Sequence, residues 1–211
     1  MDKRVGFVCF GEVNTPIERL QMKHDEALGV LKDMGYDLLD AGLVIDDEKY
    51  ATADAAAEKL RGFDMCCLVV CVAGWVPTHA VIRVTDQYRH IPMLLWGLCG
   101  WKENGRIITT AEQAGTSAIR PTFEALGYDF KYVYNIIGKD YPRAKLDAFI
   151  SACAARRALR DARVGTMGYR DMLLFGTQYE GNSMRGQLGV EVEPYETVSY
   201  THLTLPTNSL V

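Results

Sequence analysis

The sequence lacks the features that define several classes of protein. None of its apolar runs approaches the roughly 20 residues that a membrane-spanning helix needs, so we expect no membrane partner. Positive charge is also scarce, because 23 Lys and Arg are set against 27 Asp and Glu, which gives a formal net charge of −4. A nucleic acid needs a clustered basic surface, so this balance predicts no nucleic-acid partner. The densest basic group has the spacing of the solvated face and C-terminal end of a helix; it consists of Arg156, Arg157, Arg160 and Arg163.

The six cysteines form no recognisable metal site or disulfide framework. They stand at positions 9, 66, 67, 71, 99 and 153, and four of them lie inside apolar runs, where cysteine acts as a small buried hydrophobic residue. No pair has the flanking residues of a zinc site. The N-terminus passes directly into a strand-like segment, without the apolar stretch of a signal peptide. A reducing, cytoplasmic location is therefore expected.

Several nucleotide-binding and catalytic motifs are also missing. No G-x-G-x-x-G follows the first apolar run, and the chain has no Walker loop and no G-x-S-x-G nucleophile turn. The first loop would bind a flavin phosphate poorly, because the carboxylate of Glu12 would repel it. No carboxylates and histidines are paired as a divalent metal requires. The sequence therefore gives no support to a dinucleotide, nucleotide, flavin, serine-hydrolase or metal site of these common types.

Short apolar runs alternate with longer amphipathic stretches along most of the chain. Strands are predicted over residues 5–10, 36–39, 65–72, 92–96 and 130–134, and helices over residues 16–34, 52–60, 78–88, 111–126 and 142–160. This alternation predicts that residues 1–162 form an α/β domain: a flavodoxin- or Rossmann-like parallel sheet with helices on both faces. We expect the strand order 2-1-3-4-5, with the wholly apolar residues 65–72 at its centre.

Local signals define the ends and the buried face of the first helix. Thr15 is predicted to cap it, Pro16 suits its first turn, and Gly35 ends it. A stripe at helical spacing is predicted to face the core; its members are Ile17, Leu20, Ala27, Leu28 and Leu31. His24 and His90 are predicted to lie at the surface.

A second, incomplete α/β unit is predicted over residues 163–197. Residues 164–168 and 190–193 have the pattern of strands, and residues 171–188 that of a loop and helix. One such fragment cannot close a core, so apolar residues such as Met172, Leu173, Leu174 and Phe175 are expected to be exposed and to favour aggregation. Residues 198–207 fit no part of the pattern and can be encoded by codons that resemble a transposon-based sequencing adapter. We therefore expect residues 198–211 to be non-native.

Polar and aromatic residues follow the predicted strands, where open parallel sheets bind their ligands. Glu12 and Asn14 follow the first strand, Trp75 and His79 the third, and Trp101 and Gln113 the fourth. Indole rings stack on the C–H faces of sugars, and carboxylate and amide groups bind hydroxyls, so these loops are suited to a monosaccharide. Other interpretations stay open: either tryptophan could pack within its loop, Glu12 or Asn14 could cap the helix that follows, and His79 suits a surface or capping role.

Several of these segments together resemble a known family. Residues 7–16 (FVCFGEVNTP), 73–80 (AGWVPTHA), 96–101 (WGLCGW) and 109–116 (TTAEQAGT) resemble the N-terminal domain of L-fucose isomerase-like proteins. Residues 167–172 (MGYRDM) resemble the start of that family's second domain. The resemblance covers about residues 4–197, and it is the combination of segments that is specific.

The resemblance implies a three-domain L-fucose/L-arabinose-type ketol isomerase that interconverts an aldose and a ketose with a divalent metal, usually manganese. In that family the metal-binding Glu, Asp and His lie in the second and third domains, so this chain is expected to bind no metal and to be inactive alone. The N-terminal domain typically helps to shape the sugar site of a neighbouring subunit, which implies a homo-oligomer.

The resemblance also assigns substrate contacts, although the chain departs from the arabinose enzymes. Glu12 and Asn14 match the first-loop contacts, and Gln113 matches a third-loop contact. The arabinose enzymes have Gln in place of Glu12 and His in place of Gln113, which argues against L-arabinose as the substrate. Two alternatives remain open: a free-standing sugar-binding or sensor domain, and a family branch that has lost isomerase chemistry.

Overall fold

A computed structural model describes residues 2–167, 174–177 and 179–195. The chain forms two compact units, residues 1–154 and 155–211. The predicted non-native segment, residues 198–211, lies outside the described residues. Within the described residues, no helix is both long enough and apolar enough to cross a membrane.

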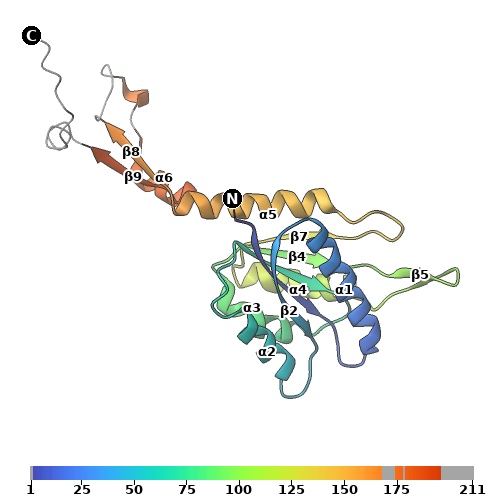
Figure 1. The fold of residues 1–211 in the computed structure, drawn as a ribbon. Helices are drawn as coiled ribbons and strands as arrows, with labels where there is room; N and C mark the ends of the chain where they lie inside the picture. The colour runs from blue at the N-terminus through green and yellow to red at the C-terminus, as the bar shows by residue number, and fades with distance from the viewer. Residues whose placement is uncertain (1, 168–173, 178, 196–211) are drawn as a thin grey trace, which may run out of the picture. The chain divides into compact units, whose positions relative to one another are not determined.

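The first unit is an α/β domain with a five-stranded parallel sheet (Figure 1). Its strands are β1 (Arg4–Phe10), β2 (Asp37–Val44), β3 (Cys67–Val72), β4 (Met93–Gly97) and β7 (Phe130–Tyr134). Its helices are α1 (Ile17–Asp33), α2 (Ala51–Leu60), α3 (Thr78–Thr85), which continues into the 3-10 turn η1 (Asp86–Tyr88), α4 (Glu112–Ala125) and the first part of α5 (Arg143–Arg160). The strand order β2-β1-β3-β4-β7 confirms the predicted fold class and order.

The sheet is covered on both faces, so its central strands are apolar throughout. Every residue of β3 is buried, which explains why its sequence shows no alternation. One face packs against α1 and α5 through residues such as Phe7, Val69 and Trp96. The other face packs against α2, α3 and α4 through residues such as Phe10 and Val70. The helices on both faces fix the carboxyl ends of the strands, and the loops that carry the candidate residues begin there.

The start of α1 differs from the prediction. Thr15 does not cap the helix: the N-cap is Pro16, which makes no side-chain capping hydrogen bond, and the Thr15 hydroxyl donates instead to Glu12 Oε1 at 3.2 Å. Ile17 is 49% exposed, so its predicted place in the core is wrong. The core begins one turn later, where Leu20 fills the space that Gly11 leaves by lacking a side chain. Gly35 ends the helix with a φ of +77°, as predicted.

The prediction for His24 is wrong and that for His90 is confirmed. His90 is exposed, whereas His24 is only 4% exposed. Its ring lies against Phe7, with the ring centroids 5.5 Å apart, and its Nε2 hydrogen-bonds to Asp40 Oδ1 at 3.1 Å. Its Nδ1 lies 2.8 Å from Asp25 Oδ1, so both ring nitrogens have carboxylate partners. These two partners make the burial of a polar ring possible.

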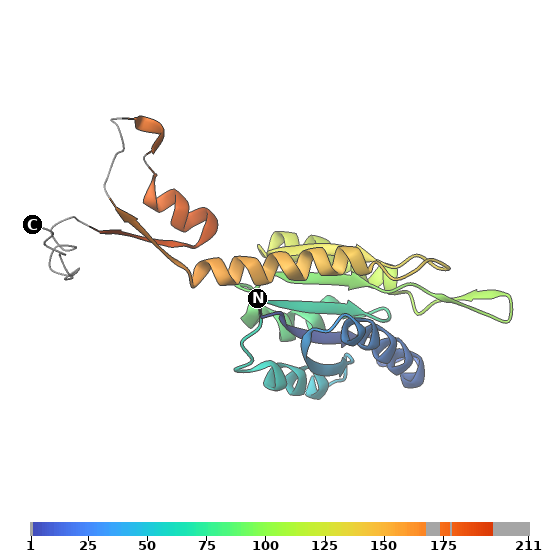
Figure 2. The same cartoon turned by 45° about the horizontal axis from the view of Figure 1, so that its top comes forward.

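A β-hairpin that the sequence analysis did not predict follows β4. Its strands are β5 (Trp101–Glu103) and β6 (Arg106–Ile108), paired antiparallel. Asn104 and Gly105 join them with φ angles of +49° and +76°, the signature of a type I′ turn. The hairpin reaches outward beyond the carboxyl ends of the parallel strands (Figures 1 and 2).

The second unit contains a short parallel pair of strands. Its described elements are β8 (Arg163–Met167), η3 (Phe175–Thr177), α6 (Gly181–Leu188) and β9 (Glu191–Tyr195). They agree with the predicted strand, loop-and-helix and strand pattern. Leu174 is 50% exposed and Phe175 is 78% exposed, as expected, while Met172 and Leu173 lie outside the described residues. Arg156, Arg160 and Arg163 are exposed, in keeping with their predicted solvated positions.

Candidate functional site

The order of the strands creates a switch point between β1 and β3. These neighbours pair in parallel, but the helix after β1 covers one face of the sheet and the helix after β3 covers the other. The loops that leave the two strands therefore diverge at the carboxyl edge, the usual ligand position in such sheets. Glu12 and Asn14 lie in the first loop, and Trp75 lies in the second. Three of the four predicted substrate contacts thus flank the switch point.

The β1 loop is held by its backbone, which leaves polar side chains available. Gly11 N donates to Val44 O at 3.0 Å, and Val13 N donates to Asp46 Oδ1 at 2.7 Å. Asn14 is exposed and Glu12 is half-buried. Neither residue caps α1, so the capping interpretation of the two residues is wrong. Among the described residues, the Glu12 carboxylate has only the Thr15 hydroxyl as a hydrogen-bond partner.

The β3 loop presents Trp75 on a fixed backbone. Trp75 N donates to Thr110 O at 2.7 Å, and the neighbouring Val76 is buried. The Trp75 side chain is nevertheless 36% exposed, so the loop does not enclose its indole. Helix α4 approaches this loop closely at Gly115, where a Cβ atom would lie 3.0 Å from the carbonyl oxygen of Gly74. The site therefore offers a partly exposed aromatic face whose position is set by two other segments.

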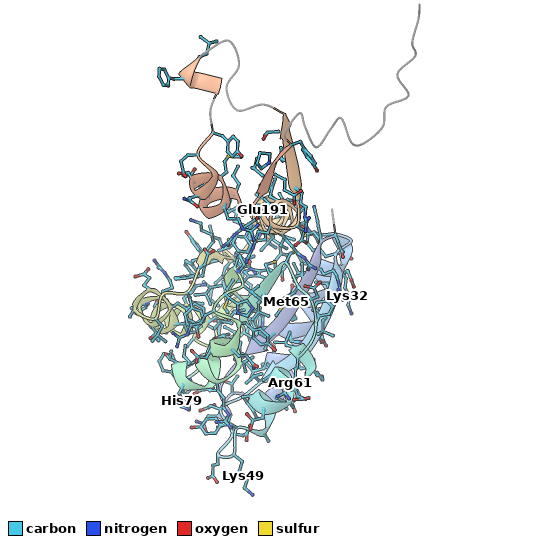
Figure 3. All side chains as sticks on the ribbon, turned by 90° about the vertical axis from the view of Figure 1, so that its left-hand side faces the viewer. Lys32, Lys49, Arg61, Met65, His79 and Glu191 are labelled. Carbon is cyan, nitrogen blue, oxygen red and sulfur yellow. The ribbon has the colours of Figure 1, made fainter. Side chains whose placement is uncertain are left out.

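His79 follows the same loop and contacts Tyr50. His79 is exposed in the first turn of α3, and its ring meets that of Tyr50 edge-on at a centroid distance of 5.5 Å. Tyr50 precedes α2 and has a left-handed φ of +55°. Figure 3 shows His79 and Lys49, the residue before Tyr50, at the same end of the molecule. His79 is thus a surface residue, as one of its two predicted roles required. The other role, capping, is wrong, because α3 has no side-chain capping bond.

Gln113 differs from the other predicted contacts, because the fold uses both ends of its amide. Its Nε2 donates to Leu98 O at 2.7 Å, and its Oε1 accepts from the Tyr132 hydroxyl at 2.8 Å. These bonds tie the first turn of α4 to the segment after β4 and to β7. Gln113 is therefore a bracing residue of the scaffold, with both ends of its amide bonded to other parts of the domain.

A buried ion pair that the sequence analysis missed lies at the same edge. Lys23 is 3% exposed and Glu112 is fully buried, and the Lys23 ammonium is paired with Glu112 Oε1. Thr109 Oγ1 donates to Glu112 Oε2 at 2.6 Å, and Lys23 Nζ lies 3.4 Å from Thr110 Oγ1. Burial lowers the pKa of Lys23 to about 8, and smaller effects of nearby thiols and of Glu26 act in the opposite direction. One signal was available: Lys23 occupies a position of the stripe that also contains Leu20 and Ala27.

A separate recess of about 290 Å³ lies beside this ion pair. It is lined by residues of α1, of the β4–β5 segment and of the loop after β7: Met22, Lys23, Glu26, Leu98, Cys99, Gly100, Trp101, Lys102, Asn135, Ile136, Ile137, Gly138, Lys139 and Tyr141. Trp101, which was predicted to contact a sugar, lies here rather than at the switch point. Glu12, Asn14, Trp75 and Gln113 do not line the recess.

The described residues contain no group of three or more His, Cys, Asp or Glu side chains that could hold a metal ion. The described residues therefore do not form a site that would fit manganese. No protein-family model matches the chain. No curated protein matches it either.

Proposed function

We propose that this chain is the N-terminal, sugar-contacting part of a metal-dependent aldose–ketose isomerase of the L-fucose/L-arabinose type. In this proposal the enzyme is a cytoplasmic homo-oligomer, and the manganese ligands and proton-transferring groups belong to other domains. The chain alone binds a monosaccharide and does not isomerise it.

One observation carries the proposal. Glu12, Asn14 and Trp75 come from two loops that flank the switch point, and their side chains are left largely unused by the fold. A carboxylate accepts hydrogen bonds from sugar hydroxyls, an amide both donates and accepts, and an indole covers a C–H face. A small hydroxylated ligand would use all three groups at once, whereas a phosphate would be repelled by Glu12.

Ligand binding by the full chain tests the sugar-contacting role. We expect saturable binding of L-fucose in NMR titrations, and Trp75→Ala should weaken it about tenfold or more, because stacking area is lost. Trp101→Phe is the matched control, since Trp101 lies in the other recess and this change should leave the affinity for L-fucose unchanged. Sugar binding that is indifferent to Trp75→Ala would contradict the assignment of the site.

The gene from which the chain is read tests the isomerase role. If the native reading frame continues beyond Thr197, we expect it to encode two carboxylates and a histidine that bind manganese. The complete product should then interconvert L-fucose and its ketose with manganese, and Trp75→Ala should reduce this activity. If the continued frame lacks those ligands while L-fucose still binds, the chain is instead a sugar-binding or sensor domain without catalysis.

A further inference from the structure

The recess between α1, the β5 strand and the loop after β7 is rich in hydrogen-bond donors. Three lysines are among its lining residues: Lys23, Lys102 and Lys139. Lys102 and Lys139 are exposed, and no carboxylate among the described residues forms an ion pair with either. Their charges are therefore available to a ligand, whereas that of Lys23 is shared with Glu112.

Asn135 adds a directed donor to this wall. Its Oδ1 accepts from Trp96 Nε1 at 2.8 Å, which fixes the amide and assigns its oxygen to the buried tryptophan. The amide nitrogen has no hydrogen-bond partner within the described part of the chain, so its two N–H groups remain for a ligand. Asn135 therefore resembles the fixed polar groups that orient ligands in concave binding sites.

Acceptors are few in the same recess. Glu26 is its only carboxylate among the lining residues, and that carboxylate is hydrogen-bonded by the Tyr141 hydroxyl. Burial and this bond raise the pKa of the Tyr141 phenol well above its ordinary value, which keeps the phenol protonated. The polar side chains of the recess that have no bonded partner among the described residues are therefore mainly donors: Lys102, Lys139 and the Asn135 amide nitrogen.

An apolar wall completes the recess. The Trp101 ring is held by two cations, with the Arg19 guanidinium 5.2 Å and the Lys23 ammonium 5.4 Å from its centroid. Its Nε1 lies 3.3 Å from Glu103 Oε2, so the indole is fixed by three neighbours. Leu98 and Met22 line the recess with it. Such a surface suits the carbon skeleton of a small polar molecule.

We propose that this recess binds a small anion of monosaccharide size: a phosphate ester or a carboxylate of a sugar or polyol. Lys102, Lys139 and the Asn135 amide nitrogen hold the anionic group, and Trp101 covers the carbon skeleton. A volume of about 290 Å³ lies at the lower end of the range for small-molecule sites, which is too small for a dinucleotide. The free ammonium groups favour an anion over a neutral sugar, because only an anion satisfies their charge.

This ligand is independent of the sugar proposed for the switch point. None of Glu12, Asn14 and Trp75 lines the recess, and neither Lys102 nor Lys139 belongs to the switch-point loops. The two sites can therefore be tested with different ligands and different substitutions, and one can fail while the other stands.

Calorimetric titration of the full chain at low ionic strength tests the proposal. The probes are inorganic phosphate, D-glucose 6-phosphate, D-gluconate and D-glucose. We expect the sugar phosphate or the sugar acid to bind, with an affinity that falls as salt is added, and D-glucose not to bind here. Comparison of D-glucose 6-phosphate with D-gluconate decides between a phosphate and a carboxylate, and inorganic phosphate shows what the anionic group contributes alone.

Three variants locate the binding. The double variant Lys102→Ala, Lys139→Ala should weaken anion binding at least tenfold, because two charge-assisted contacts are lost. Asn135→Asp should also weaken it about tenfold, since a carboxylate replaces the donor while an oxygen remains for Trp96. Lys32→Ala is the matched control: Lys32 is exposed at the far end of α1 (Figure 3), and its removal subtracts one positive charge without touching the recess.

Circular dichroism of each variant separates a loss of binding from a loss of folding. The proposal is overturned if none of the anions binds at concentrations up to about 10 mM, because a dissociation constant above that value is too weak for a specific site. It is also overturned if Lys32→Ala weakens binding as much as the double variant, or if D-glucose binds as tightly as its phosphate ester. Loss of L-fucose binding in Trp75→Ala leaves this proposal untouched and tests only the switch-point site.

Discussion

The ion pair of Lys23 and Glu112 shows how single residues hold the carboxyl edge together. Lys23 belongs to α1 and Glu112 to the start of α4, and both are almost completely buried. Two charges removed from water are costly unless each satisfies the other, and loss of one partner leaves the remaining charge uncompensated. The pair joins the helix that follows β1 to the helix that follows the hairpin, so it braces both candidate sites.

Removal of Glu112 alone should therefore be more harmful than removal of the whole pair. We expect Glu112→Leu to lower the free energy of unfolding by about 3–5 kcal/mol, because the Lys23 charge stays buried without a partner. The double variant Lys23→Met, Glu112→Leu should recover much of this loss. Urea denaturation measures both values. Glu58→Ala, which removes an exposed partner of Arg61, is the control and should change little; equal effects of the single and double variants would contradict the explanation.

His24 should make stability depend on pH. Burial lowers the pKa of its ring, but the bonds to Asp40 and Asp25 outweigh burial and raise the pKa to about 9. An unfolded histidine titrates near pH 6.5, so the stabilisation is complete below that pH and is lost as pH rises through about 9. We expect a loss of about 2 kcal/mol between pH 6.5 and 8.

Chemical denaturation of wild type and His24→Gln at several pH values measures this effect. The window below pH 8 is informative because the lowered pKa of Lys23, about 8, acts with the opposite sign above it. His24→Gln should flatten the curve between pH 6.5 and 8, and the exposed His90→Gln should not. Parallel curves for wild type and His24→Gln would show that the histidine does not carry the dependence.

The sequence could predict the apolar residues of α1 better than its polar ones. Leu20, Ala27 and Leu28 are buried at the predicted helical spacing. His24 and Lys23 are buried as well, and their partners Asp40 and Glu112 are separated from them by 16 and 89 positions. A local pattern cannot reveal such a partner, because burial of a polar group depends on what the fold brings to it.

At the scale of elements, the hairpin is the feature that the sequence analysis missed. Its two strands have three residues each, too few for a period of two to be visible. The Asn104–Gly105 turn was the available signal. The long elements were predicted because their patterns persist: β3 is apolar throughout, and α4 ends at Gly127 with a φ of +73°. Long helices and strands could therefore be predicted from their patterns, and the short strands of the hairpin could not.

The turn glycine of the hairpin allows a clean test. Gly105 has a φ of +76°, and no atom lies within 4 Å of the position that a Cβ would take there, so Gly105→Ala introduces backbone strain without a clash. We expect the amide hydrogens of Trp101 and Ile108, which form a hydrogen-bonded pair across the hairpin, to exchange faster by about fivefold, which corresponds to roughly 1 kcal/mol.

Gly29→Ala is the matched control for this substitution. Gly29 lies inside α1 and has equally open space, but its backbone is helical. Alanine should therefore stabilise the domain by about 0.5–1 kcal/mol and leave exchange in the hairpin unchanged. Slower or unaltered exchange in Gly105→Ala would show that the turn does not limit the stability of the hairpin.

At the scale of the whole molecule, the two units differ in how completely they are built. The first unit has a five-stranded sheet with helices on both faces and a core on each side. In the second unit, the described residues form one two-stranded sheet and the short helix α6, which has no buried residue. A two-stranded sheet is marginal by itself in water, so the stability of the chain resides mainly in the first unit.

The apolar residues of the second unit should make the full chain associate. Leu174, Phe175 and Tyr179 are exposed within one short segment, at 50%, 78% and 43%. Light scattering coupled to gel filtration should show a mass that rises with concentration, because contact between copies removes this apolar surface from water. The double variant Leu174→Ser, Phe175→Ser should reduce the association, whereas Ile107→Ser, at a 63% exposed position of the hairpin, should not. Since the first unit carries the core, both variants should unfold at the wild-type temperature. A monodisperse monomer at every concentration would show that the exposed segment does not drive contact between copies.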